Sequence, residues 1–198
     1  MFKTISDDAL DQLFRSARSH NGWKDKPVSD VLLRALYEIM KWGPTTSNSQ
    51  PQRILFLRTQ AQKDRLKPAM SASNQEKTIT APVVAILAYD LKYWEHIERF
   101  YPIVAKSYME RSRTDAAFTA LTAFRNATLQ AGYFIIAARA LGLDCGPMSG
   151  FDNAKVDAEF FPEGQFKSNF LCSIGTGDPA KLKPRYGRFE FDQVCKIL

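Results

Sequence analysis

His20 and His96 are the only histidines of the 198-residue chain, so they are the first candidates for metal binding or acid–base chemistry. Neither stands at a His/Cys spacing that is typical of a metal site, so we expect no bound metal. Ser149 lies in the pattern G-x-x-S-G, whereas a hydrolase presents its nucleophile in G-x-S-x-G. The chain also lacks the P-loop pattern that cradles nucleotide phosphates. The sequence therefore disfavours hydrolysis and P-loop phosphoryl transfer.

A dinucleotide fingerprint is suggested near the end of the chain, where Gly175, Gly177 and Ala180 fit G-x-G-x-x-A after an expected strand. Such a unit needs a helix, a further strand and an acidic residue about twenty positions on. Pro179 and Pro184 would interrupt that helix, since proline cannot donate a helical hydrogen bond. We interpret the match as accidental. Three polar segments remain that are hard to explain as surface alone, over residues 18–21, 44–51 and 146–151.

The elements that must position these segments are read from hydrophobic periodicity and from turn residues. Residues 144–151 are expected to form a turn-rich loop, and the aromatic-rich residues 93–108 to pack or to line an entrance. The long segment 114–141 is apolar or small around most of its circumference, which indicates a large core or a subunit interface. Helices and short strands alternate unevenly, as in α/β or α+β folds. We expect helices over residues 7–18, 31–40, 60–69, 73–80, 114–141 and 155–160, and strands over 53–58, 82–88 and 169–174.

Composition is that of a globular protein, with 45% hydrophobic and 24% charged residues, and we expect a single domain over residues 1–198. The first residues are polar and acidic where a signal peptide is apolar, and no apolar run could span a membrane. The three cysteines are widely spaced, which favours a reducing compartment, so we expect a cytoplasmic protein. The net charge is +6, but the basic residues are scattered without a nucleic-acid-binding motif, so we expect no nucleic-acid partner.

At this point the chain resembles the nitroreductase family of FMN-dependent flavoproteins. The resemblance spans nearly the whole chain and rests on four stretches in the family's order. They are Ala-Arg-Ser-His-Asn-Gly-Trp at 17–23, Gly-Pro-Thr-Thr-Ser-Asn-Ser-Gln-Pro at 43–51, Ala-Leu-Gly-Leu-Asp-Cys-Gly-Pro-Met-Ser-Gly-Phe-Asp at 140–152, and Ile-Gly at 174–175 followed by a basic tail. Within the family, the chain is most similar to the malonic semialdehyde reductase branch of RutE type. The stretches that suggest this branch are His-Asn-Gly-Trp, Met-Lys-Trp-Gly-Pro-Thr, Thr-Ala-Phe-Arg-Asn and Gly-Pro-Met-Ser-Gly-Phe-Asp.

The resemblance implies an α+β fold, a three-layer α-β-α sandwich with helices on both faces of a mixed sheet. It implies an intertwined homodimer with the 114–141 helix at its centre and FMN at the interface. Arg18 and Ser19 match the family's contacts to the FMN phosphate, and His20 belongs to the same segment. Lys183 and Arg185 match its C-terminal basic contact. On the residues alone, Arg18 is equally explained as a charge at a helix C-terminus. Asn21 replaces a basic residue of most relatives.

The other contacts to the cofactor are implied in the same way. Thr45, Thr46, Ser47 and Asn48 match a loop that reaches the flavin from the neighbouring subunit, although an ordinary Ser/Thr turn would have the same composition. Asn74 and Lys77 match two residues near the flavin ring, where Lys77 would stabilise negative charge at the N1–C2=O edge. A solvated lysine is the alternative. Pro147, Met148, Ser149 and Gly150 match the loop under the flavin, with a backbone N–H of Ser149 or Gly150 at flavin N5; a glycine-rich turn is the alternative.

The implied activity is hydride transfer from NADH or NADPH through flavin N5 to a small acceptor, by a ping-pong mechanism and without a catalytic side chain. The acceptor expected from the resemblance is malonic semialdehyde, reduced to 3-hydroxypropionate. Arg53 or Arg125 would then pair with the substrate carboxylate, unless it forms a structural ion pair. A broad nitroreductase or quinone reductase is the first alternative, and a flavin-binding protein without turnover is the second.

Overall fold

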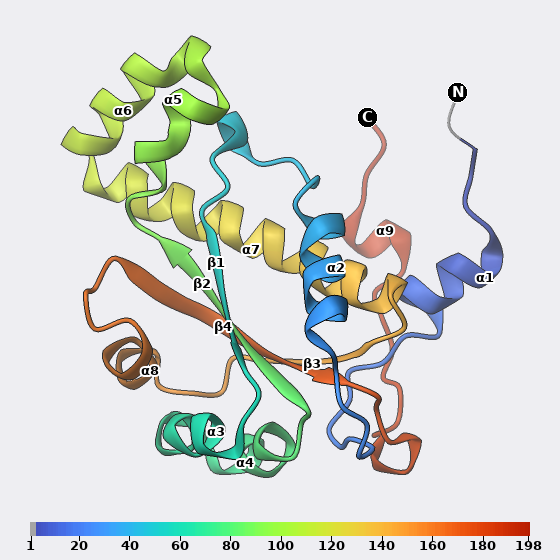
Figure 1. The fold of residues 1–198 in the computed structure, drawn as a ribbon. Helices are drawn as coiled ribbons and strands as arrows, with labels where there is room; N and C mark the ends of the chain where they lie inside the picture. The colour runs from blue at the N-terminus through green and yellow to red at the C-terminus, as the bar shows by residue number, and fades with distance from the viewer. Residues whose placement is uncertain (1–2) are drawn as a thin grey trace.

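A four-stranded sheet lies between two layers of helices, as Figure 1 shows for the computed structural model, which describes residues 3–198. The strands run in the order β1-β2-β4-β3, and each neighbouring pair is antiparallel. They are β1 (Gln52–Leu57), β2 (Val83–Asp90), β3 (Asp144–Met148) and β4 (Phe166–Gly175). The predicted three-layer α-β-α sandwich is confirmed. The predicted mixed sheet is wrong for these four strands, and an isolated bridge between Ser19 and Cys145 supplies the parallel pairing.

Helices α2 and α7 cover one face of the sheet, and α3, α4 and α8 lie on the other side (Figure 1). Short turns of π- or 3-10 helix extend α1 over Asp11–Arg15 and α3 over Lys67–Ala69. The helices are α1 (Asp7–Leu10), α2 (Asp30–Met40), α3 (Gln60–Leu66), α4 (Ala72–Ile79), α5 (Ile97–Phe100), α6 (Ala105–Thr114), α7 (Ala116–Ala140), α8 (Asn153–Phe160) and α9 (Phe191–Val194).

Strand β2 holds the two cores together because its side chains alternate between them. Val83 and Leu87 pack into the cluster formed with α2 and α7, and Phe134 of α7 is fully buried there. Val84 and Ile86 pack into the second cluster, with α3 and α8. A strand that is covered on both faces reads as a continuous apolar run, which is why the sequence predicted it correctly.

Helix α7 is the longest element, at 25 residues, and Asp115 caps it by accepting a hydrogen bond from the Phe118 backbone N–H at 2.8 Å. One face is buried against the sheet. The opposite face leaves Leu121, Phe124 and Leu129 about half exposed in a single chain. The apolar circumference predicted from the sequence therefore divides into a core face and a face that this chain does not cover.

The strand predicted over residues 169–174 is longer and spans Phe166–Gly175, and two further predicted boundaries are wrong. The helix expected over residues 7–18 ends at Arg15, where the guanidinium binds Asp7 and Asp11, and the next residues extend so that Ser19 reaches β3. The turn-rich loop expected over residues 144–151 begins instead with strand β3. Pro147 is tolerated within β3 because an edge strand needs hydrogen bonds on only one side.

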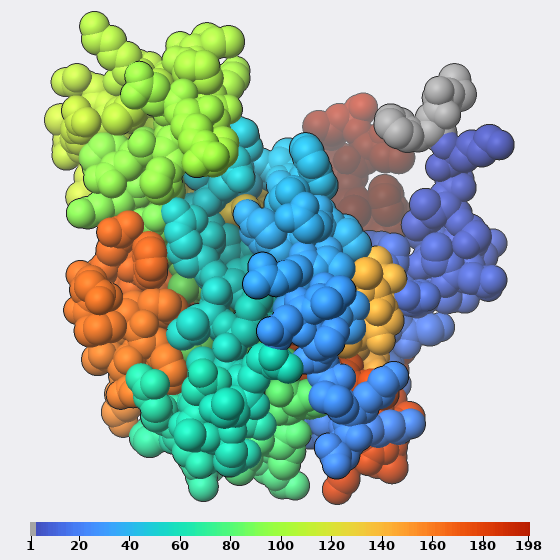
Figure 2. Space-filling model, in the orientation of Figure 1, coloured from blue at the N-terminus to red at the C-terminus, as the bar shows by residue number. Residues whose placement is uncertain are grey.

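The aromatic-rich residues 93–108 belong to a helical excursion through α5 and α6. Tyr93 is fully buried there, with its ring edge-on to Tyr108 at 6.2 Å between centroids. Figure 2 shows α5 and α6, in yellow-green, rising from one corner of the molecule. Within residues 3–198, no helix is both long and apolar enough to cross a membrane.

Phe134 stacks on Phe56 at 6.3 Å between ring centroids, so it joins α7 to β1. Replacing Phe134 with alanine should lower the free energy of unfolding by roughly 3–5 kcal/mol, because a large fully buried ring leaves a cavity. Val31→Ala is the control, since Val31 is 76% exposed and its loss should cost about 0.5 kcal/mol or less. Urea denaturation of both variants at one protein concentration measures the difference. Equal small effects would show that Phe134 does not anchor this core.

Candidate functional site

A basic hollow of about 520 Å³ lies where the segment after α1 meets the C-terminal tail. Arg18 donates a hydrogen bond to the carbonyl of Lys183, and Arg185 donates to the carbonyl of Ala17 at 2.8 Å. These bonds bring together residues that are 165 or more positions apart in the sequence. Ser19 also lines the hollow. Its charged lining residues are all cationic: Arg15, Arg18, Arg139, Lys183, Arg185 and Arg188. Such a donor set suits a multiply charged oxyanion.

Lys77 on α4 reaches toward the same hollow. Its Nζ lies 3.3 Å from Oδ1 of Asn21, which is also a lining residue. Burial, with the nearby charge of Lys183, lowers the pKa of Lys77. The Trp23 indole N–H fixes the same helix turn by donating to the Lys77 carbonyl at 2.9 Å. The structure thus places Lys77 beside Asn21, the position at which the family resemblance implies a basic residue.

The loop after β3 is held in place through the Gly150 carbonyl, which accepts hydrogen bonds from three donors. The Gly150 carbonyl accepts from the Ser71 N–H at 3.0 Å, the Ser71 hydroxyl at 2.6 Å and Asn74 Nδ2 at 3.0 Å. A Cβ on residue 150 would lie 2.5 Å from Asn74 Nδ2, so only glycine fits without displacement. Sequence reasoning missed Ser71; its position just before α4, typical of an N-cap residue, was the available signal.

Beyond this anchor, the loop presents backbone donors. Within residues 3–198, the N–H groups of Ser149 and Gly150 donate to no protein acceptor. Pro147 and Ser149 line a shallow hollow of about 480 Å³ beside Phe124 of α7. The Met148 side chain is largely buried in the second core, where the Thr78 hydroxyl lies 3.2 Å from its Sδ. Met148 therefore anchors the loop with its side chain.

His20 is buried, and its side chain joins the segment that carries Arg18 to strand β3. Its Nε2 lies 3.3 Å from Asp144 Oδ1, and the other carboxylate oxygen accepts from the Gly177 N–H at 2.8 Å. A Cβ on Gly177 would clash with the His20 ring, and a Cβ on Gly175 would lie 2.8 Å from Pro82. The glycines of the G-x-G-x-x-A match are therefore explained by packing. In the described part of the chain, His20 Nδ1 has no hydrogen-bond partner.

The loop containing Thr45, Thr46, Ser47 and Asn48 forms a second group. The Thr46 N–H donates to Oδ1 of Asn126 at 2.8 Å, and Asn48 Nδ2 donates to the Phe100 carbonyl at 3.3 Å. Ser47 and Asn48 have φ of 50° and 49°, a left-handed conformation that costs roughly 1–3 kcal/mol per residue. Asn126 was missed in the sequence. A polar residue inside the apolar helix α7 was the available signal.

The candidate residues thus fall into two separate groups. The first contains Arg18, Lys77, Gly150 and their neighbours, and the second is the loop of residues 45–48. Across residues 3–198, no hydrogen bond or ion pair joins the two groups. The polar contacts within one chain therefore leave the two groups unconnected.

Arg53 and Arg125, the two arginines predicted to pair with a substrate carboxylate, differ in whether the protein already binds their side chains. Arg53 forms an ion pair with Asp90 at 2.5 Å, and Asp90 is 1% exposed. Arg53 also donates to the backbone carbonyls of Gln50 and Gln52. It is a structural residue. Arg125 is exposed on α7 and, among the described residues, has neither an ion pair nor a hydrogen-bonded side chain. As for metals, the described chain contains no cluster of three or more His, Cys, Asp or Glu that could bind an ion.

Comparison with known proteins gives relatives over the full length. A Ralstonia nicotianae protein named for NADH dehydrogenase or NAD(P)H nitroreductase activity is 50% identical, over 98% of this chain and 99% of its own. A similarly named protein of Burkholderia lata is 52% identical, over 98% of each chain.

Among solved structures, a Bacillus subtilis nitroreductase has a TM-score of 0.83 at 22% identity, covering 98% of this chain and 100% of its own. An Exiguobacterium sibiricum nitroreductase, solved in complex with FMN, has a TM-score of 0.83 at 17% identity, covering 100% of both chains. At these identities the likeness shows a shared fold. The model of the Nitroreductase family matches residues 14–176. The chain therefore belongs to the nitroreductase family.

Proposed function

We propose that this protein is an FMN-dependent NAD(P)H oxidoreductase that acts in the cytoplasm as a homodimer. The observation that carries the proposal is the basic hollow, which gathers Arg18, Lys183 and Arg185 with no acidic lining residue. A phosphate dianion is the oxyanion for which such a donor set is most suited. The names of the relatives in Ralstonia and Burkholderia support NADH or NADPH as the reductant.

The residues present fit the flavin as well as its phosphate. Arg18, Ser19, Lys183 and Arg185 would hold the phosphate, and His20 would keep that segment on β3. Bound FMN would supply hydride transfer at N5, from the nicotinamide to the acceptor. The free N–H groups of Ser149 and Gly150 would orient that edge of the ring.

The charge of Lys77 would stabilise the negative charge that accumulates on the pyrimidine edge after reduction. Asn74 would contribute by holding the Gly150 carbonyl, and its Oδ1 would remain free for the ring. No side chain at the site stands as a general acid or base in this scheme.

The two separate groups of candidate residues support a dimer. Loop 45–48 would complete the site of the neighbouring subunit. The outer face of α7 and the tail both offer apolar surface for such a contact, since Phe124 is 46% and Phe191 57% exposed. Figure 1 shows α9 and the C-terminal tail, in dark red, on the side of the molecule that carries α1. Burying this surface against a second copy would remove it from water.

For the acceptor, we propose a small aldehyde acid such as malonic semialdehyde, with Arg125 as the partner of its carboxylate. Arg53 is already committed to Asp90, so Arg125 is the remaining candidate of the pair. A nitroaromatic compound or a quinone is the second candidate, and the names of the relatives favour nitro reduction.

Anaerobic addition of NADH or NADPH to the FMN-loaded protein should bleach its visible flavin absorbance, and an acceptor should restore it. If neither nicotinamide bleaches the bound flavin, the protein binds flavin without turning over.

Arg125→Ala separates the two acceptor classes in the same assay. It should lower kcat/KM for malonic semialdehyde by about 10- to 100-fold, the value of one charge-assisted hydrogen bond. Turnover of an uncharged nitroaromatic should be unchanged. An equal loss on both substrates would contradict the role of Arg125.

Arg18→Ala should weaken FMN binding by about 10- to 100-fold, because a charge-assisted contact to the phosphate is lost. Riboflavin has the same ring without the phosphate, so its affinity should barely change. Arg34→Ala is the matched control, since Arg34 is exposed on α2 outside the hollow. Fluorescence titration measures all three proteins. An equal loss of FMN and riboflavin affinity would place Arg18 away from the phosphate.

Coexpression of Arg18→Ala chains with Thr46→Glu chains tests the shared site. Each variant alone should bind FMN poorly. A mixed dimer, isolated through two different tags, should have one site built from an unchanged hollow and an unchanged loop, so it should bind one FMN per dimer. Mixed dimers that bind no better than the parents would show that loop 45–48 does not complete the partner's site.

A further inference from the structure

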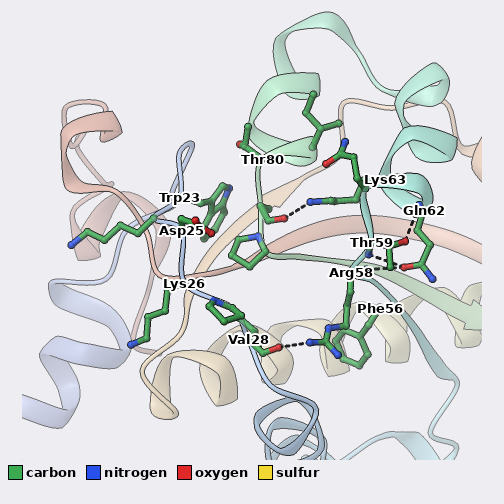
Figure 3. A pocket seen from close by; sticks show the side chains of 16 residues that line it. Trp23, Asp25, Lys26, Val28, Phe56, Arg58, Thr59, Gln62, Lys63 and Thr80 are labelled. Atoms are coloured by element: carbon green, nitrogen blue, oxygen red, sulfur yellow. Dashed lines mark hydrogen bonds between the residues drawn. The ribbon is translucent and has the colours of Figure 1, made fainter.

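A second hollow, of about 900 Å³, lies apart from the basic hollow of Arg18 and Lys183. Figure 3 shows its three walls. One wall is the extended segment of residues 23–28. The second is the end of β1 with the start of α3, over residues 58–63, and the third is the turn of residues 79–82 between α4 and β2. A space of this size accommodates a small organic molecule.

Lys63 is the unusual residue of this hollow because its charged side chain is only 7% exposed. Its Nζ donates to the Ala81 carbonyl at 2.8 Å, as the dashed line in Figure 3 marks. Within residues 3–198, no carboxylate lies within ion-pair distance of that Nζ. Burial lowers the pKa of Lys63, and the charge of the adjacent Asp64 offsets this only in part. A buried ammonium with one protein acceptor has two N–H bonds left to satisfy.

The remaining charges of the lining are mostly positive. Lys24 and Lys26 lie on the extended wall, and Asp25 between them is the one acidic lining residue. Arg58 lies on the second wall, where it binds Asp30 and donates to the Val28 carbonyl at 2.9 Å. The field in the hollow therefore favours an anion over a neutral or cationic guest.

We propose that this hollow is a second binding site, for a small organic anion whose carboxylate or phosphate group binds the Nζ of Lys63. The anion supplies the counter-charge that the protein does not, and its oxygens accept the N–H bonds that Ala81 leaves free. The competing explanation is that Lys63 only caps the C-terminal end of α4, as lysines do at helix ends. A cap alone needs no guest, so binding measurements separate the two.

The site adjoins the cofactor site through shared elements. Helix α4 carries Asn74 and Lys77 toward the basic hollow, and it ends at the turn whose Ala81 carbonyl Lys63 holds. Trp23 lines the second hollow while its indole N–H holds the Lys77 carbonyl. The basic hollow could also bind phosphate, so phosphate binding is measured on the FMN-loaded protein, in which FMN already occupies that hollow.

Calorimetric titration with inorganic phosphate and with malonate, at constant ionic strength set by chloride, tests the proposal. At least one of the two anions should bind once per chain, and the better probe identifies the anionic group. Lys63→Met should weaken that binding at least tenfold. Lys67→Met is the matched control, because Lys67 is exposed just after α3 and outside the lining. Absence of binding by both anions, or unchanged affinity in Lys63→Met, would overturn the proposal.

A second measurement uses the unaltered chain, in case Lys63→Met does not fold. Acetylation of individual lysines by acetic anhydride is followed by mass spectrometry with and without saturating malonate or phosphate. A bound anion should slow acetylation of Lys63 several-fold, since it holds the amine protonated and covered, and should leave Lys67 unchanged. Equal rates at Lys63 with and without both anions would show that Lys63 is a helix cap only.

Discussion

The central strand β2 exposes almost none of its side chains, since α2 and α7 cover one face and the layer of α3 and α8 covers the other. Burial of this strand on both faces fixes the three layers, and it disfavours polar side chains along the middle of β2 because an unpaired polar group there would lose its hydrogen bonds to water. Polar side chains therefore gather at the margins. The candidate site lies where the edge strand β3, helix α4 and the segment after α1 meet.

At that margin, a few hydrogen bonds and ion pairs, rather than hydrophobic packing, hold the segments of the candidate site in place. Asp144 holds both His20 and Gly177, so one carboxylate reinforces the backbone bridge that ties the Arg18 segment to the sheet. The Gly150 carbonyl is held by Ser71 and Asn74 in a similar way. Because these bonds satisfy the carbonyls and side chains, they leave the N–H groups of Ser149 and Gly150 without protein partners. Arg18 and Arg185 of the basic hollow each donate to one backbone carbonyl and keep further N–H groups for a ligand. Those free groups are what a ligand can use.

The exposed apolar surface, like the free polar groups, is available to a binding partner. Apolar residues of a 25-residue helix are normally buried, yet Leu121 and Phe124 face outward on α7. The strained loop of residues 45–48 is likewise held in place by Asn126 and by its bond to the Phe100 carbonyl, and none of its bonds reaches the group of Arg18, Lys77 and Gly150. Both features are explained together if a second copy covers α7 and receives the loop, as we propose.

The sequence by itself determined the elements whose periodicity is strong. It predicted α2, α7 and the buried run of β2, because continuous burial leaves a pattern of apolar residues that a short window can show. It missed β3 and the end of α1, because an edge strand with Gly146 and Pro147 has no such pattern and is defined only by its partner β4. The family resemblance named the candidate site residues. Only the tertiary structure decided that Lys77 lies beside Asn21, that Arg53 is committed to Asp90, and that Lys63 is buried without a carboxylate. Each of these depends on contacts between distant residues, which local patterns do not encode.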